Sequence, residues 1–243
     1  MKKLLFIILV FLSICVNAQF DGNKRFYCDT VTSSNTNISV LKTTNIKSGT
    51  NIIMLNVLGI RLYGDATSWE DLQFPLTAAK LTGVSDPSFT KIVDNGAGST
   101  GIYAYSFSAS ADQQVFVSTE MPHDWKEGSN YYFHLHWYPA TTDTGRIVFS
   151  VETATSDINS IAGNSYVTRY VYSITVNSIK KHLMTELFTV NASALHISHG
   201  IGFTIKRLGS DPSDTYPGTI WITRAAIHYE RDSFGSNTKL DKD

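Results

Sequence analysis

Eight short runs of strand-forming residues constrain the fold of this chain more than any other feature of its sequence. The runs are rich in Tyr, Phe, Val, Ile and Thr, and Gly, Asn, Asp, Ser or Pro separates them. They cover residues 102–109, 115–120, 131–138, 146–154, 166–176, 182–190, 202–208 and 219–231. Strands at this spacing are typical of β-sandwiches and barrels, whereas α/β folds alternate strands with helical segments. We therefore expect an all-β, antiparallel fold.

Residues 131–138 show the alternation of a strand most clearly. Successive side chains of a strand point to opposite faces of the sheet. One face therefore carries Phe133, Leu135 and Trp137, and the other carries Tyr132, His134, His136 and Tyr138. We expect one face of each strand to belong to a core.

The N-terminal residues predict a different organisation. Lys2 and Lys3 precede an apolar stretch over residues 4–16, and Ala18 ends a site typical of signal-peptide cleavage. The apolar stretch is shorter than the ~20 residues of a membrane-spanning helix. We expect a signal peptide over residues 1–18, a polar arm or tether over residues 19–50, and a β-sandwich domain over residues 51–243. The protein would then be secreted to the periplasm, the outer surface or the medium.

The charge balance argues against a nucleic-acid partner. Without Lys2 and Lys3, the 20 basic residues fall to 18 against 21 acidic ones, a formal charge of −3. Proteins that bind nucleic acids neutralise phosphates with clustered basic side chains, and no basic stripe is present in this sequence. Removal of residues 1–18 also leaves Cys28 as the one cysteine, so the mature chain has no intramolecular disulfide.

His134 and His136 are candidate metal ligands. Two histidines separated by one residue lie on the same face of a strand and can share a divalent metal, an arrangement similar to the metal sites of cupins. Such sites also need a carboxylate about four residues later, but Ala140 and Thr141 stand there. Glu120 or Glu152 would have to approach from neighbouring strands. The alternative is that both histidines are structural residues beside Trp137.

Two further groups of residues are candidates for binding or acid–base chemistry. His123 and Asp124 precede a Gly-containing turn, and a carboxylate beside a histidine can support proton transfer. No recognisable nucleophile accompanies them. Tyr132, Trp137 and Tyr138 belong to a set of aromatic residues that could stack on sugar rings or fill the core. The other members of that set are Tyr131, Tyr170, Tyr172, Tyr216 and Trp221.

The order of several short motifs resembles a family of virion structural proteins from tailed phages and prophages. The motifs are residues 69–75 (WEDLQFP), 86–89 (DPSF), 94–101 (DNGAGSTG), 121–128 (MPHDWKEG), 134–139 (HLHWYP), and 228–232 (HYERD) with Gly235 and Ser236. The resemblance implies a jelly-roll-like β-sandwich without an established catalytic activity. The signal peptide departs from that pattern, since virion proteins assemble in the cytoplasm.

We therefore expect a non-enzymatic structural or adhesive protein with a jelly-roll-like sandwich and an N-terminal arm. It would act without a cofactor, as a homo-oligomer such as a trimer that packs outward residues like Tyr170 and Tyr172 together. Its other partners would be virion proteins, cell-surface proteins or glycans, and it would be virion-associated if a phage encodes it. A secreted carbohydrate-binding module and a metal-dependent enzyme that uses His134 and His136 are the alternatives.

Overall fold

The computed structural model describes residues 18–20, 26–28, 44–48, 50–56, 59–161, 163, 165–175, 179–236, 238–240 and 242. The chain forms two compact units, residues 1–41 and residues 42–243. The first unit contains a hairpin of β1 (Ala18–Phe20) and β2 (Phe26–Cys28). The predicted signal peptide lies almost wholly outside the described residues. Within the described part of the chain, no helix is long and apolar enough to span a membrane.

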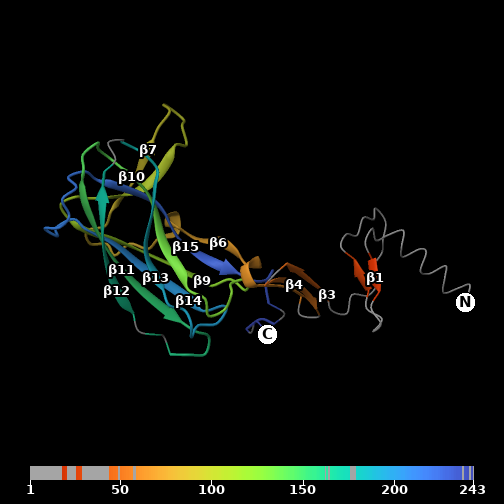
Figure 1. The fold of residues 1–243 in the computed structure, drawn as a ribbon. Helices are drawn as coiled ribbons and strands as arrows, with labels where there is room; N and C mark the ends of the chain where they lie inside the picture. Colours follow the sequence, from red (N-terminus) through yellow and green to blue (C-terminus); the bar gives the residue numbers. More distant parts are fainter. Residues whose placement is uncertain are drawn as a thin grey trace, which may run out of the picture. The chain divides into compact units, whose positions relative to one another are not determined.

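Eight consecutive strands of the second unit form a jelly roll (Figure 1). One sheet has the order β13-β10-β15-β8, and the other has the order β12-β11-β14-β9, with every neighbouring pair antiparallel. The strands are β8 (Ile102–Phe107), β9 (Asp112–Glu120), β10 (Tyr131–Pro139), β11 (Gly145–Ser156), β12 (Tyr166–Ile174), β13 (Leu183–Val190), β14 (Gly200–Leu208) and β15 (Ile220–Arg231). Each corresponds to one of the eight predicted runs, so the all-β, jelly-roll-like sandwich is confirmed.

Residues before the jelly roll extend its first sheet to six strands. β6 (Ser68–Pro75) pairs antiparallel with residues 224–231 of β15. On the same side of β15, the earlier residues 220–222 pair with β8. β7 (Ser88–Val93) pairs with β8. A separate three-stranded sheet contains β3 (Thr44–Ser48), β4 (Asn51–Asn56) and β5 (Gly59–Tyr63). Two short 3-10 helices, η1 (Gly64–Ala66) and η2 (Leu76–Ala78), flank β6.

The core lies between the two sheets and is built from one face of each strand. Phe133, Leu135 and Trp137 of β10 are fully buried, as are Phe149 of β11 and Ile205 of β14. Burial of a large apolar side chain stabilises a fold by roughly 1.5–3 kcal/mol, so this layer is the main source of stability. The predicted period of two in residues 131–138 thus identifies the core face correctly.

Several aromatic residues predicted as a possible binding platform belong to this core instead. Trp137, a predicted binding residue, is fully buried, and its indole N–H donates to Thr185 Oγ1 at 3.0 Å. Tyr131 and Tyr216 are also buried. Tyr170 and Tyr172 pack half-buried against the core, and Tyr172 lies edge-on to Trp137. Tyr170 and Tyr172 are therefore not outward residues available for packing between subunits.

One charged pair lies in the same interior. The Arg207 guanidinium and the Asp214 carboxylate have no exposed side-chain surface, and they form a two-bond ion pair at 2.8 and 3.0 Å. The remaining N–H groups of Arg207 donate to three backbone carbonyls, those of Phe107, Tyr216 and Gly218. All five donors of the guanidinium are thereby used.

Candidate functional site

The outer face of the six-stranded sheet carries a group of polar and aromatic side chains. On β10 the outward residues are Tyr132, His134, His136 and Tyr138, as the alternation predicts. The ladder places Tyr132 opposite His228 of β15, and it places His228 opposite Asp71 of β6. Three neighbouring strands thus bring residues from distant parts of the sequence onto one surface.

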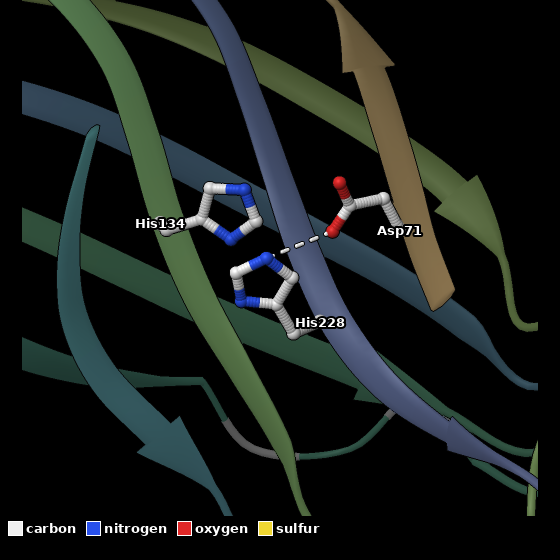
Figure 2. Close-up of side chains that lie close together, drawn as sticks. All are labelled: Asp71, His134 and His228. Atoms are coloured by element: carbon white, nitrogen blue, oxygen red, sulfur yellow. Dashed lines mark ion pairs between the residues drawn. The ribbon is translucent and has the colours of Figure 1, made fainter. Parts of the chain in front are cut away.

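Asp71, His134 and His228 form a compact cluster on this surface. Figure 2 shows their side chains pointing toward one another from β6, β10 and β15. One possible ligand atom from each residue lies within 4.8 Å of those of the other two. The His228 Nε2 atom is 3.0 Å from Asp71 Oδ1, and the His134 and His228 rings stack with their centroids 4.0 Å apart. Two imidazoles and one carboxylate are a ligand set used for zinc and other transition metals.

His134 is an unusual polar residue because it is fully buried on a face that is otherwise solvated. Its side chain has no exposed surface, and neither ring nitrogen has a well-placed hydrogen-bond partner among the described residues. Burial, followed by the nearby charges of His228 and His136, lowers the pKa of His134 to about 4. Asp71 and the backbone of Tyr132 act in the opposite direction, but the Tyr132 backbone is too poorly aligned to satisfy either ring nitrogen. At neutral pH the ring is therefore uncharged and able to accept a ligand through a nitrogen lone pair.

His136 lies beside this cluster but has a different partner. Its Nδ1 atom is 3.0 Å from Nε2 of His182, while its ring is edge-on to His134 with centroids 5.1 Å apart. Burial, and then His182 and Arg224, lower the pKa of His136. The predicted pair of His134 and His136 is thus adjacent, but His228, rather than His136, shares a three-residue cluster with His134.

The carboxylate of the cluster is one that the sequence argument missed. Glu120 lies on β9 and Glu152 on β11, both in the other sheet, so neither reaches His134 from a neighbouring strand. Asp71 is supplied instead by β6, which precedes the jelly roll in sequence. Alternation in residues 69–74 places Asp71 between Trp69 and Gln73 on one strand face, but no local pattern indicates that this strand pairs with β15.

A shallow depression of about 290 Å³ borders the cluster. Trp69, Tyr132, Glu186 and His228 line it. Trp69 is 60% exposed, and its ring is edge-on to Tyr132 with centroids 5.5 Å apart. Glu186 is an exposed residue of β13 that faces His134 across the ladder. Tyr132, a predicted binding residue, is therefore placed where a ligand could reach it.

The other predicted binding residues lie outside this depression. Tyr138 is half-buried on the same outer face and stacks on His182 with centroids 5.0 Å apart. The His123 ring lies between the hydroxyls of Ser236 and Ser198, at 2.5 and 2.7 Å. Asp124 accepts a hydrogen bond from the Tyr229 hydroxyl.

Asp124 also has an ion pair with Arg231, 3.0 Å from Nε to Oδ2. These contacts fasten the loop between β9 and β10 to the end of β15. The predicted pair of His123 and Asp124 is thus divided between two separate sets of partners.

The outer face of the four-stranded sheet has a larger hollow but a different lining. Its volume is about 740 Å³, and the small residues Ser118, Ala154 and Gly202 are among those that line it. Phe116, 39% exposed, is the aromatic side chain at its outer surface, and Glu152 is hydrogen-bonded to Ser165 at 2.5 Å. Small residues make room here without supplying clustered titratable groups. This hollow is the larger of the two, but the outer face of the six-stranded sheet has the clustered histidine, carboxylate and aromatic side chains that a binding site needs. We therefore take that face as the candidate site.

Comparisons with known proteins add only distant likenesses. No family model matches the chain, and no curated protein matches it. An arabinose-bound GH51 α-L-arabinofuranosidase is 15% identical with a TM-score of 0.34, and the match covers 65% of this chain but 24% of that enzyme. A family 28 carbohydrate-binding module specific for non-crystalline cellulose is 9% identical with a TM-score of 0.34, covering 64% of this chain and 87% of the module.

A family 61 module in complex with β-1,4-galactotriose is 11% identical with a TM-score of 0.32, over 66% of this chain and 88% of the module. The chain therefore spans about a quarter of the arabinofuranosidase and most of each module. Likenesses at this level do not bear on what this chain binds.

Proposed function

We propose that this protein is a non-enzymatic adhesive or structural module that binds a carbohydrate on the outer face of its six-stranded sheet. The observation that carries the proposal is the exposed indole of Trp69, held edge-on by Tyr132 at the rim of a solvent-open depression. A flat aromatic surface of this kind matches the C–H face of a sugar ring, and its rigid side chain loses little conformational freedom on binding.

Polar groups around the indole would supply orientation. Glu186 can accept hydrogen bonds from sugar hydroxyls, and His228 can donate or accept depending on its tautomer. Both line the same depression as Trp69 and Tyr132. Binding sites commonly combine apolar or aromatic surface with a few such polar groups.

We propose that the protein acts on the surface of a phage particle or of a cell. The resemblance to virion structural proteins favours an exposed role on a phage particle, and the predicted signal peptide favours one on a cell surface after cleavage near Ala18. In either setting the module would act as a homo-oligomer such as a trimer, because several copies raise the avidity for a repeated glycan. Light scattering of the purified protein tests this part, and a monodisperse monomer at micromolar concentration would contradict it.

The binding proposal is tested by a glycan array followed by calorimetry with the best glycan. Replacing Trp69 with Ala should weaken binding by about tenfold or more, equivalent to about 1.4 kcal/mol. Phe116→Ala is the matched control because Phe116 is an exposed aromatic residue on the opposite sheet. Unchanged binding by Trp69→Ala, or loss of binding by Phe116→Ala alone, would place the glycan site elsewhere.

A further inference from the structure

We propose that Asp71, His134 and His228 bind one divalent transition-metal ion, with Zn²⁺ the ion that the ligand set fits best. The proposed ion sits beside the glycan-binding depression, but its binding does not depend on a glycan. The two proposals share His228 and differ in every other residue. They can therefore fail separately.

The geometry needs little change to hold such an ion. Zinc binds histidine nitrogen at about 2.0–2.1 Å and carboxylate oxygen at about 2.0–2.2 Å, so two ligand atoms around one tetrahedral ion lie roughly 3.3–3.5 Å apart. His228 Nε2 and Asp71 Oδ1 are already 3.0 Å apart. All three ligand atoms lie within 4.8 Å of one another, a gap that small side-chain rotations close.

The second observation is the buried, unpartnered ring of His134. A buried polar group without a partner costs free energy, and native proteins rarely contain one without a reason. A metal bound through one ring nitrogen would supply the missing interaction. His134 is placed for this role because a ring nitrogen lies within 4.8 Å of ligand atoms of both Asp71 and His228, and its strand is the neighbour of β15.

The chemistry of the ligands selects the class of ion. Ca²⁺ and Mg²⁺ prefer sites made of oxygen atoms, whereas imidazole nitrogen favours zinc and its transition-metal neighbours. Metal binding also requires neutral imidazoles, because the ion is bound through the lone pair of a ring nitrogen. Three protein ligands leave a fourth position for water, as in many sites that are not closed by protein.

The test begins with the purified full protein stripped of metal by a chelator. Addition of ZnCl₂ should give one equivalent of bound metal per chain by calorimetry and elemental analysis, with a rise in melting temperature. CoCl₂ should give the visible d–d absorption of a low-coordinate Co²⁺ site with nitrogen ligands. Binding should weaken at acid pH as the imidazoles become protonated.

Three substitutions locate the ion. His134→Gln and His228→Gln should abolish the stoichiometric Co²⁺ spectrum, and Asp71→Asn should weaken metal binding by about tenfold or more, a loss that even supporting residues around metals produce. His182→Gln is the matched control because it removes the nearby imidazole that contacts His136. Should His134→Gln fail to fold, His228→Gln and Asp71→Asn carry the test, since both replace side chains that are not fully buried.

The outcomes decide the proposal. No stoichiometric Zn²⁺ or Co²⁺ in the wild-type protein would overturn it. Loss of metal in His182→Gln with retention in His134→Gln would move the site to His136 and His182 and would also overturn it. Trp69→Ala should keep its metal, so a failed glycan experiment leaves the metal result intact.

Discussion

Two fully buried polar side chains, one in each sheet, have opposite surroundings. Arg207 of β14 uses all five of its donors, on Asp214 and three backbone carbonyls. His134 of β10 has no well-placed partner for either ring nitrogen among the described residues. A fully paired buried group has no donor or acceptor left for a ligand, whereas an unpaired one leaves an interaction available. The contrast therefore separates a structural centre from a candidate functional one.

Removal of the paired group should have the largest effect on stability. Arg207→Met leaves the Asp214 carboxylate buried without its cation, which should lower the free energy of unfolding by about 3–5 kcal/mol. Urea denaturation monitored by fluorescence measures the change. Arg169→Met is the control, because the ion pair of Arg169 with Asp211 is exposed. Similar losses of unfolding free energy in the two variants would show that the buried Arg207 pair stabilises the fold no more than a surface ion pair does.

Removal of the unpaired group should have the opposite sign. In metal-free protein, His134→Leu replaces an unsatisfied buried ring with an apolar side chain, which should raise the free energy of unfolding by about 1–3 kcal/mol. The same denaturation experiment, carried out in chelator, measures the gain. Excess Zn²⁺ should stabilise the wild-type protein and leave this variant unchanged. A destabilised variant in chelator would mean that His134 is a satisfied structural residue.

His199 lies between these two extremes. It is buried against Trp125 and Tyr131, its Nδ1 atom is 2.5 Å from the His196 carbonyl oxygen, and its Nε2 atom has no hydrogen-bond partner among the described residues. Burial is the first cause that lowers its pKa, while the His196 carbonyl contact and the charges of Asp157 and Glu127 oppose that change and the charge of His196 adds to it.

This lowered pKa makes stability depend on pH. The unfolded chain takes up a proton near the ordinary histidine value of 6.5 and the folded chain only at lower pH, so stability is lost as pH falls from about 6.5 through the folded pKa. The slope is at most about 1.4 kcal/mol per pH unit for one histidine. Unfolding of His199→Leu in a pH series should show a flatter acid limb than the wild-type protein, and an unchanged slope would contradict the assignment.

Exposed aromatic residues should matter least to stability on either sheet. Trp69→Ala and Phe116→Ala should each change the free energy of unfolding by less than about 1 kcal/mol, because surface substitutions rarely do more. Thermal denaturation of both variants checks this. A larger loss in Trp69→Ala would mean that its contact with Tyr132 supports the sheet. The glycan-binding test would then be repeated with the more conservative variant Trp69→Phe.

The strands were predictable because their signal is local. Alternation and turn residues identified all eight strands of the jelly roll, including the core face of β10, from neighbours in the sequence. The same alternation places Trp137 on the core face with Phe133 and Leu135. The prediction of Trp137 as a binding residue was therefore wrong, and the sequence already contained the pattern that contradicts it. Tyr132 was placed correctly on the outer face.

Of the three cluster residues, His134 alone was predictable as a ligand, because the other two come from distant segments. His134 was identified from its position beside His136. Asp71 and His228 join it through the pairing of β6 with β15 and of β15 with β10. Such non-local pairing leaves no periodic trace in the sequence: residues 219–231 are predicted as a strand, but nothing in the sequence predicts that this strand pairs with the one that carries Asp71.

The antiparallel pairing of β6 with β15 has a mechanical consequence. Ser68 lies opposite Arg231, so the chain enters β6 and leaves β15 at the same end of the ladder. Tension applied through the preceding residues and the C-terminal segment would open this ladder one rung at a time from that end. The Asp71–His228 pair is the fourth rung of this ladder when Ser68–Arg231 is counted as the first. An ion bound by Asp71, His228 and His134 would link β6, β15 and β10 at that rung. The force needed to separate β6 from β15 would therefore rise there when the metal is bound.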